Sequence, residues 1–278
     1  MTTTPEETTP AGAPRPRERR QRVQAAETGM AVLKGLARLG GKASLTALAA
    51  HVGESPAKVH RYLMSLVEEG LVAQDAGSQH YHLGAEAIQI GLAAMRQADP
   101  VRVAEPSLAR LREGLEVTCF VAIMGNKGPT IVRFEEPGLP VTVNVRVGSV
   151  MSLLWSATGR VFLGLLDASR VRALAQEELA ALPNALRAQL DAADPIGRVQ
   201  REVQAEIAAS GCTAVRDTNL RGISAVAAPL FDHGGRLCAV LTALGASGGF
   251  DAALDGPVAL ALRREARTAS ALLGQAAG

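Results

Sequence analysis

The chain of 278 residues is long enough for two domains, one small and one of ordinary size. Hydrophobic residues make up 47% and charged residues 20%, so most of the chain can bury a core. Aromatic residues are only 3%, which disfavours a nucleic-acid surface built on stacked bases. Because no apolar run is long enough to span a membrane and no secretory signal pattern opens the chain, we expect a cytoplasmic protein without a membrane partner.

The three cysteines, Cys119, Cys212 and Cys238, lie far apart and form no CxxC pair. This spacing fits a reducing cytoplasm and gives no support for a structural zinc site. Each cysteine lies in an apolar strand or at the end of a helix, where a buried and inert thiol is the usual finding. We therefore expect no metal and no cofactor.

Positive charge is concentrated toward the N-terminus. Residues 15–84 carry ten Lys and Arg against six Asp and Glu, a net charge of +4, whereas the whole chain carries +2. This imbalance is typical of a DNA-binding module, although its size alone is not decisive. Residues 1–22 have no hydrophobic period and are expected to be a disordered arm, whose basic stretch PRPRERRQR fits either DNA contact or a solubilising tail.

Helix signals follow the arm in quick succession. Apolar residues at spacings of three and four predict a first helix that starts at Val23 and ends before two glycines. A second helix begins after Ser44, its expected N-cap, and a third begins after Ser55, with Pro56 in its first turn. Two short apolar segments around a polar turn then predict a hairpin near Tyr81.

Three helices and a hairpin in this order are the layout of a winged helix-turn-helix, whose third helix lies in the major groove of DNA. Arg61 and Lys58 can pair with guanine edges or phosphates, and His60 can donate to either, while an ordinary exposed helix face is the alternative. The expected DNA-binding residues are Ser44, Thr46, Ser55, Ala57, Lys58, His60, Arg61 and His80.

Two histidines stand two residues apart in the second wing strand, His80 and His82. Such a pair can suggest a metal site, but the sequence supplies no third ligand nearby. Contact with a DNA phosphate or plain exposure is therefore the better interpretation.

Residues 85–98 predict a helix with Ile88, Leu92 and Met95 along one face. Asp99 and Pro100 close it. A partner subunit is the simplest cover for this apolar face, because a two-fold dimer presents two half-sites to DNA. The expected organisation is an arm at 1–22, a DNA-binding domain at 23–84, a dimerisation helix at 85–99 and an effector domain at 100–278.

The remaining residues predict an α+β domain with a largely antiparallel sheet, because short hairpin turns force neighbouring strands to reverse. The expected helices cover 106–115, most of 167–209, and a last amphipathic segment that contains Leu262. The expected strands cover 117–124, 130–134, 141–147, 225–231 and 237–244.

Three segments in the same order resemble the IclR-type (isocitrate lyase regulator) family of transcription factors. They are the run from VQAAETGMAVL to SQHYHLG, the run VGSVMSLLWSATGRVFLGLL, and ISAVAAPLFDHGGRLCAVLTALG, and the likeness covers about residues 23–274. The resemblance implies a winged helix-turn-helix, a dimerising linker helix and a GAF-like effector domain. It also implies a homodimer or homotetramer that binds double-stranded operator DNA and controls a catabolic operon in response to a small organic acid, with RNA polymerase as a candidate partner.

The reading helix departs from the family pattern. Relatives often carry a Ser-Thr pair before the Val-His-Arg sequence, whereas this chain has Ala57 and Lys58 before Val59, His60 and Arg61. Two hydroxyl donors are thereby replaced by a methyl group and a long cation. The operator sequence consequently cannot be transferred from relatives.

The resemblance also locates an effector site, where backbone N–H groups at Ala157, Thr158 and Gly159 meet the acid. In glyoxylate-type relatives four polar side chains complete the site, and the corresponding positions here are Val215, Ala225, Thr242 and Leu244. Only Thr242 keeps a hydroxyl, so a tiny polar acid would be poorly satisfied.

The loss of polar groups favours a larger or more apolar ligand, such as an aromatic or branched acid. Its carboxylate is expected at the amides around Thr158, and its body against Leu154, Trp155, Val215 and Leu244. Trp155 is the single tryptophan, and a position in the core or at an interface is as good an interpretation of it as contact with the ligand.

Two other classes of protein compete with a DNA-binding regulator. An enzyme is disfavoured because the chain contains no GxSxG, HExxH or phosphate-loop motif. The second alternative is a winged-helix adaptor that acts through protein contacts without sequence-specific DNA binding. The sequence does not decide between activation and repression.

Overall fold

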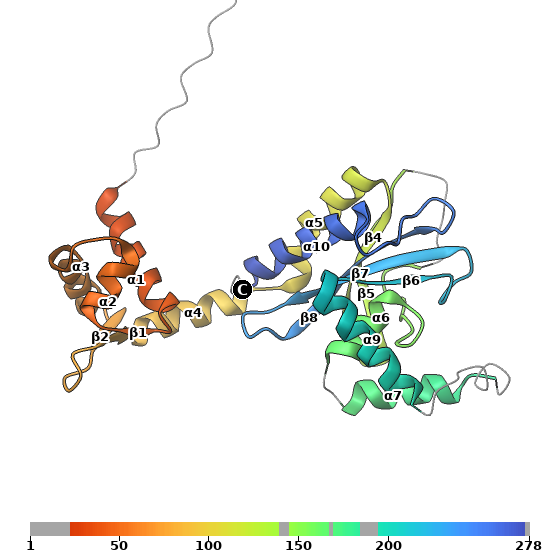
Figure 1. Ribbon diagram of the computed structural model, residues 1–278, viewed down its shortest axis with the longest axis horizontal. Coiled ribbons are helices and arrows are strands. Elements are labelled where there is room, and N and C mark those ends of the chain that lie inside the picture. Colours follow the sequence, from red (N-terminus) through yellow and green to blue (C-terminus); the bar gives the residue numbers. More distant parts are fainter. Residues whose placement is uncertain (1–22, 139–144, 167–168, 184–193, 276–278) are drawn as a thin grey trace, which may run out of the picture. The chain divides into compact units, whose positions relative to one another are not determined.

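The computed structural model describes residues 23–138, 145–166, 169–183 and 194–275. The expected basic arm at 1–22 lies outside the described residues. The chain divides into two compact units between Ala94 and Met95, within helix α4 (Ala85–Gln97), and each unit is described by itself (Figure 1).

The first unit is a winged helix-turn-helix of three helices and a small sheet. The helices are α1 (Gln24–Arg38), α2 (Leu45–Val52) and α3 (Pro56–Glu68). The strands β1 (Lys42–Ala43), β2 (Val72–Gln74) and β3 (Tyr81–Leu83) form an antiparallel sheet in the order β1-β3-β2. Strand β1 was not expected from the sequence, because two residues are too few to show the alternation of apolar and polar side chains that marks a strand. Val32, Leu36, Leu48, Val59 and Leu63 form the fully buried centre of this unit.

The expected helix caps of this unit are confirmed. Ser44 Oγ accepts a hydrogen bond from the backbone N–H of Ala47 at 3.2 Å, and Ser55 Oγ accepts one from that of Lys58 at 3.3 Å. Gly53 ends α2 in the left-handed conformation that glycine adopts without strain. The two caps fix where α2 and α3 begin, and hence which residues stand at the start of the reading helix.

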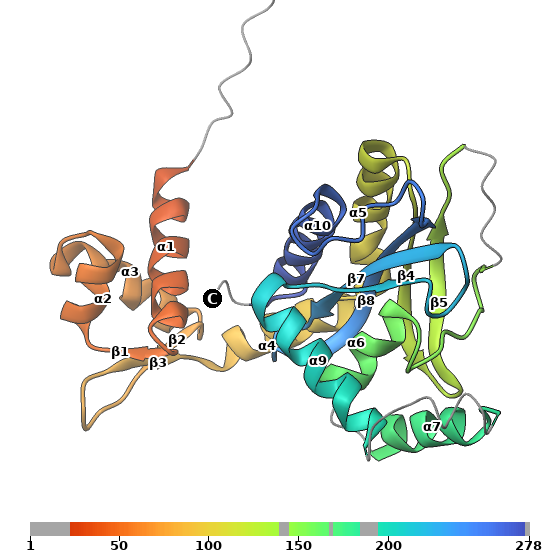
Figure 2. The same cartoon turned by 45° about the vertical axis from the view of Figure 1, so that its right-hand side comes forward.

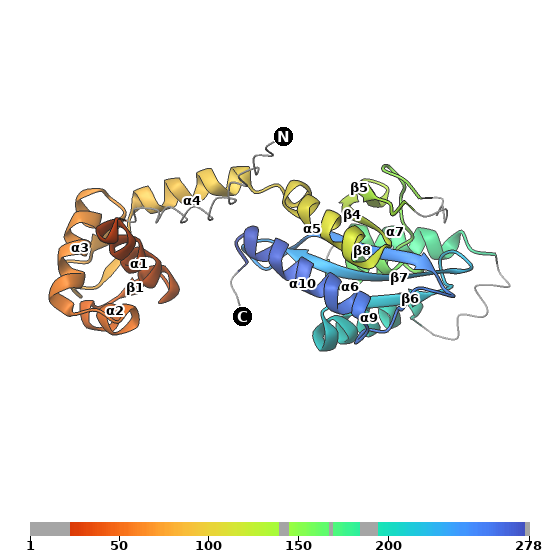
Figure 3. The ribbon, with the colours of Figure 1, turned by 90° about the horizontal axis from the view of Figure 1, so that it is seen from above.

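Helix α4 carries apolar side chains but buries none of its residues. Ile88 and Ile90 are each 60% exposed, Met95 46% and Leu92 39%. Figure 3 shows α4 as one continuous helix. Within the described residues, its apolar side chains are largely exposed to solvent.

The second unit is built on a five-stranded antiparallel sheet in the order β5-β4-β8-β7-β6. Its strands are β4 (Thr118–Gly125), β5 (Gly128–Glu135), β6 (Thr213–Arg216), β7 (Ile223–Phe231) and β8 (Leu237–Ala246). The long inner strands β7 and β8 are buried almost throughout, because helices cover both faces of the sheet.

Two pairs of helices cover the two faces (Figure 2). Helices α5 (Pro100–Leu115) and α10 (Pro257–Leu272) pack on one face around a core that includes Leu111, Leu241 and Leu262. Helices α6 (Ala157–Leu165) and α9 (Pro195–Ser210) cover the other, with α7 (Ser169–Ala180) beside them. The two cores are separated by the sheet, so a site on the α6 face is enclosed independently of α5 and α10.

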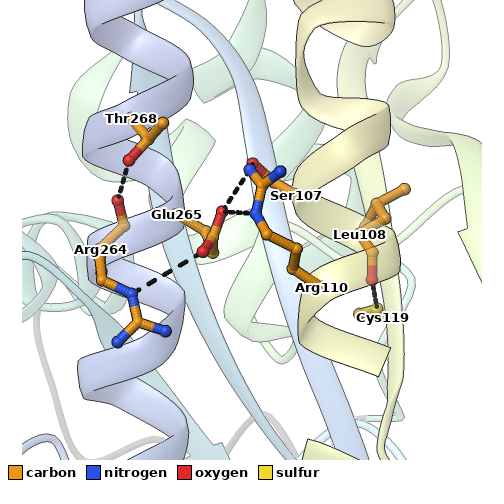
Figure 4. A network of polar contacts seen from close by, with 7 residues as sticks. All are labelled: Ser107, Leu108, Arg110, Cys119, Arg264, Glu265 and Thr268. Atoms are coloured by element: carbon orange, nitrogen blue, oxygen red, sulfur yellow. Dashed lines mark hydrogen bonds and ion pairs between the residues drawn. The ribbon is translucent and has the colours of Figure 1, made fainter. Parts of the chain in front are cut away.

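An ion pair fastens α5 to α10 (Figure 4). Glu265 is only 5% exposed, and one carboxylate oxygen accepts two hydrogen bonds from Arg110, the shorter at 2.7 Å. Burial acts to raise the pKa of Glu265, but hydrogen bonds from Arg110 and Ser107 outweigh it and hold the pKa below its ordinary value. The carboxylate is therefore charged in the folded protein near neutral pH.

Three expected elements of the second unit differ from the structure. Helix α5 starts at Pro100 rather than at Pro106, because Asp99 caps it by accepting from the N–H of Val101 at 2.9 Å. Residues 145–147 of the expected strand at 141–147 form no strand, and 141–144 lie outside the described residues. The expected helical region at 167–209 is two helices, α7 and α9, with 167–168 and 184–193 outside the described residues.

Val215 lies in the edge strand β6, a strand that was not expected from the sequence. A strand of four residues gives too short an alternation to be recognised, and its pairing with β7 is what defines it.

None of the helices within the described residues is long and apolar enough to cross a membrane.

Candidate DNA-contacting helix and effector cavity

The exposed face of α3 presents the residues expected to touch DNA. Val59 and Leu63 are fully buried and turn the opposite face, with Ala57, His60 and Arg61, to solvent. Within the described residues, the Arg61 guanidinium makes no hydrogen bond or ion pair. It is the cation on this face that is ready to bind a phosphate or a guanine edge without first breaking an existing contact.

Lys58, the second expected cation, is already paired. Its Nζ lies 2.7 Å from Glu54 Oε1, one turn earlier, and both side chains are about one third exposed. An exposed pair of this kind contributes little to stability, so it can open. Contact between Lys58 and DNA nevertheless requires that Glu54 release it, which was not evident from the sequence.

Three histidines near the proposed DNA-contacting surface, His60, His80 and His82, differ in their hydrogen-bond partners and in the elements that carry them. His60 Nδ1 lies 3.2 Å from the hydroxyl of Tyr81, which joins α3 to strand β3. His80 precedes β3 and its Nδ1 lies 3.0 Å from the carbonyl oxygen of Ser78, whereas His82 lies within β3. Within the described residues no group of three or more His, Cys, Asp or Glu is placed to hold a metal ion.

A small cavity lies between the sheet of the second unit and the start of α6. The strand register explains which residues form the sheet side of the cavity. Val215, Ala225 and Leu244 are cross-strand neighbours on β6, β7 and β8. Thr242 faces the same way two residues from Leu244. Six of the nine residues expected from the sequence line this cavity together: Ala157, Thr158, Val215, Ala225, Thr242 and Leu244.

The start of α6 supplies backbone donors to this cavity. Ser156 caps the helix by accepting from the N–H of Gly159 at 2.9 Å, and its carbonyl accepts from Arg160. The N–H groups of Ala157 and Thr158 have no partner within the described residues, although both residues are 1% exposed. Two buried donors of this kind at a helix N-terminus have the chemistry that suits a carboxylate.

The one hydroxyl expected to remain in the site is already engaged. Thr242 Oγ1 lies 2.8 Å from Thr158 Oγ1, and both side chains are buried. Because each hydroxyl has one donor and two acceptor positions, the pair keeps a single O–H for a ligand. The side walls are otherwise mostly apolar.

Three expected site residues do not line the cavity. Leu154 is buried in the core of the α6 face, and Trp155 packs against the edge of that core. Gly159 has a packing role, since a Cβ there would lie 1.9 Å from the carbonyl oxygen of Ser152. The segment before α6 therefore crosses too close to the helix for any side chain at Gly159.

The cavity also has lining residues that the sequence did not indicate. They are Phe120, Val145, Met151, Ser156, Asn219, Leu220 and Ile223. Phe120 of β4 pairs with Thr242 of β8, which explains why Phe120 lines the cavity. The sequence alone does not show which strands are neighbours in the sheet. The space enclosed is about 20 Å³, where one water needs roughly 10–15 Å³, so a larger ligand requires the lining to move.

A carboxylate of α7 fixes the segment that leads into α6. Glu178 accepts hydrogen bonds from the N–H of Leu153 at 2.8 Å and from the hydroxyl of Ser152. Ser152 Oγ in turn accepts from the N–H of Trp155 at 2.8 Å. These bonds hold the turn whose end presents the free N–H groups.

The cysteines are not activated as nucleophiles. Burial raises the pKa of the Cys119 thiol to about 12, and it raises the pKa of Cys212 and of Cys238 to about 11. All three thiols are therefore protonated near neutral pH, and the thiolate is the reactive form. This agrees with the expectation of inert cysteines.

A winged helix-turn-helix joined to an antiparallel α+β unit defines the class of helix-turn-helix transcriptional regulators. Two family models match the chain: IclR helix-turn-helix domain over residues 25–76, and Bacterial transcriptional regulator IclR C-terminal over residues 92–271. The chain belongs to the IclR family of transcriptional regulators. The expected family and fold class are thereby confirmed, and DNA is a partner of the winged helix.

Individual relatives agree with this assignment. The crystal structure of Pseudomonas aeruginosa HmgR is 39% identical, with a TM-score of 0.83 over 92% of this chain and 100% of that one. The probable transcriptional regulator SauR of Cupriavidus necator is 26% identical, covering 76% of this chain and 81% of that protein. The regulator BhcR of Paracoccus denitrificans is 27% identical, and the match covers 73% of this chain and 70% of that protein. The family consists of regulators and not enzymes, as expected.

Proposed function

We propose that this regulator controls a catabolic operon in response to an aromatic or branched organic acid bound in the cavity of its second unit. The supporting observation is that Ala157 and Thr158, whose N–H groups have no partner within the described residues, line a cavity with mostly apolar walls. The amides suit a carboxylate, and the apolar walls suit a hydrocarbon body.

The composition of the walls argues against the smallest keto acids as effectors. Val215, Ala225 and Leu244 offer methyl groups at three positions, and the hydroxyls of Thr158 and Thr242 are bonded to each other. A ligand with many polar atoms would lose its water without gaining matching hydrogen bonds. For a ligand with a hydrocarbon body, burial of apolar surface would instead favour binding.

An acid of aromatic size needs more room than the cavity offers as it stands. Met151 is an unbranched side chain with several rotatable bonds, and Leu220 is 39% exposed at the cavity. We expect these two side chains to move when the ligand enters. Such a movement gives the ligand a preference for one arrangement of the effector unit, and that preference is what allows binding to alter affinity for DNA.

On the DNA side, we propose that Arg61 and Lys58 contact base edges or phosphates, with Ala57 and His60 beside them on the same face of α3. Ser44, Thr46 and Ser55 at the starts of α2 and α3, and His80 in the wing, are proposed to contact phosphates. The capping serines accept backbone hydrogen bonds, so their own O–H groups stay available as donors. Helix α4 is proposed to cover its apolar face in a homodimer, which can assemble further to a tetramer.

Titration calorimetry with the purified full chain tests the effector proposal. The panel contains glyoxylate and pyruvate, two branched acids, and benzoate and phenylacetate. We expect an aromatic or branched acid to bind at least about tenfold more tightly than glyoxylate, a difference of about 1.4 kcal/mol. Tight binding of glyoxylate or pyruvate, with no response to the apolar acids, would refute the proposed ligand class.

A further inference from the structure

Two residues that line the cavity, Asn219 and Leu220, lie on the loop between β6 and β7, and Asn219 is the polar one of the two. The loop joins β6 to β7 and is pinned at its base by Asp217, which has a left-handed φ of 55°. Asp217 Oδ1 accepts from the N–H of Gly222 at 2.7 Å and from the hydroxyl of Ser247 at 2.8 Å. The two ends of the loop are thereby held together.

A second contact fastens the same loop to the turn that leads into α6. Thr218 Oγ1 donates to the carbonyl oxygen of Trp155 at 2.7 Å, in the turn that leads into α6. Asn219 follows Thr218 directly and lines the cavity. Its position is therefore fixed by its neighbours on both sides rather than by bonds of its own.

The polar side chains around the cavity differ in what they can still offer a ligand. Ser156 Oγ accepts from Gly159 and donates to the carbonyl of Ser152. Thr158 and Thr242 are bonded to each other. The Asn219 side-chain amide has no hydrogen-bond partner within the described residues, so it keeps two N–H donors and a carbonyl acceptor.

Asn219 is partly buried and lines a mostly apolar cavity, where an amide is stabilised by a partner that both donates and accepts. A hydroxyl group does both, while an ether or a halogen does not. The loop that carries Asn219 is a different wall of the cavity from the helix start that carries the free N–H groups of Ala157 and Thr158. One ligand that reaches both walls needs two polar ends with a body between them.

We propose that Asn219 determines effector specificity by hydrogen bonding to a hydroxyl group on the body of the acid, so that the preferred ligands are hydroxylated aromatic or branched acids. This inference rests on the proposed function of the cavity as an acid-binding site. In this arrangement the carboxylate is bound at the start of α6, and Asn219 selects among acids of the same skeleton.

The test compares matched pairs of acids in titration calorimetry: benzoate and phenylacetate, each against its three monohydroxylated ring isomers. The proteins are wild type, Asn219→Leu, which removes the amide at nearly constant size, and Asn219→Ala as a second variant. The matched control is Thr218→Val, which breaks the loop contact to Trp155 but keeps the amide. Circular dichroism and thermal melting confirm that each variant is folded.

We expect at least one hydroxylated acid to bind wild type about tenfold more tightly than its parent, as one hydrogen bond of about 1.4 kcal/mol allows. In both Asn219 variants this advantage falls to within about twofold, while affinity for the parent acid changes by less than about twofold. Thr218→Val is expected to reduce the hydroxyl preference less than either Asn219 variant does, because it loosens one contact of the loop but leaves the amide in place.

Two outcomes overturn the inference while leaving the acid site intact. Wild type that binds the parent acids but never prefers a hydroxylated one contradicts it, as does an Asn219 variant that keeps the full hydroxyl preference. If wild type binds none of the acids, the proposed function itself fails, and the role of Asn219 falls with it.

Discussion

At the scale of single residues, the two cations of the reading helix are not equivalent. Arg61 is unengaged within the described residues, whereas Lys58 is paired with Glu54 at 2.7 Å. An arginine presents a rigid planar fork to guanine or phosphate, while a lysine acts as a point charge. Most of the free energy of DNA recognition from this face is therefore expected to come from Arg61.

Replacing Arg61 by alanine is expected to weaken binding to the operator by about 1–3 kcal/mol, roughly 5- to 150-fold, because a bidentate or charge-assisted contact is lost. Fluorescence anisotropy with labelled operator DNA at several salt concentrations measures this change. The matched control is Arg236→Ala, which removes an exposed arginine from the turn between β7 and β8. Equal effects of the two substitutions would contradict the role of Arg61.

Local signals in the sequence were enough to predict the start of the reading helix. Ser55 and Pro56 mark it because capping and the first helical turn depend on a few consecutive residues. Asn219 carried no such signal, since its place depends on Asp217 and Ser247, which lie far apart in sequence. Trp155 was ambiguous for the same reason: only the packed structure shows that it borders the core rather than the cavity.

At the scale of elements, helices with caps were predictable, whereas short edge strands and strand partners were not. Strand β6 has four residues and exists through its pairing with β7, and that pairing puts Val215 in the row with Ala225 and Leu244. The resemblance to relatives had pointed to these three positions together. The register supplies the physical reason they share one wall.

A charge on the apolar face of α4 is expected to disrupt dimerisation and DNA binding together. Ile88→Glu or Leu92→Glu would place a carboxylate in the proposed interface, which we expect to weaken self-association at least about tenfold. Gln89→Glu adds the same charge to the same helix at a polar position and is the control. Sedimentation analysis combined with DNA titration provides the measurement, and unchanged self-association of Ile88→Glu and Leu92→Glu would refute this role for α4.

The ion pair between α5 and α10 makes a prediction about stability and pH. Glu265→Gln is expected to lower the free energy of unfolding by about 1–3 kcal/mol at pH 7, because hydrogen bonds to a charged group are lost. Since the pKa of Glu265 is lowered in the folded state, its contribution is present above the unfolded pKa of about 4.3 and is lost as pH falls through the folded value. The difference between wild type and variant should therefore shrink toward acid pH.

Urea denaturation from pH 7 down to about pH 2.5 measures that difference, because the loss is expected below the unfolded pKa. Glu113→Gln, at an exposed carboxylate of α5 that pairs with Arg112, is the control and should change stability little at any pH. A stability difference for Glu265→Gln that stays constant or grows toward acid pH would contradict the account of the ion pair.

At the scale of the whole molecule, regulation requires that the acid and the DNA each prefer one of two states of the protein. The coupling is then reciprocal, so that an acid which weakens operator binding is itself bound less tightly when the operator is present. A small ligand in a nearly closed cavity can supply such a preference, because its entry requires the lining to rearrange. An acid that binds both states equally would leave DNA binding unchanged, however tightly it bound.

Together these features lead us to expect that this chain binds specific DNA and that an organic acid adjusts the binding. The most direct measurement is unbiased selection of DNA sequences by the purified full chain at low salt, repeated with each acid of the panel. We expect an enriched sequence with two half-sites, whose affinity falls steeply as salt rises and changes with at least one aromatic or branched acid. The absence of any enriched sequence at low salt, with and without the acids, would contradict it.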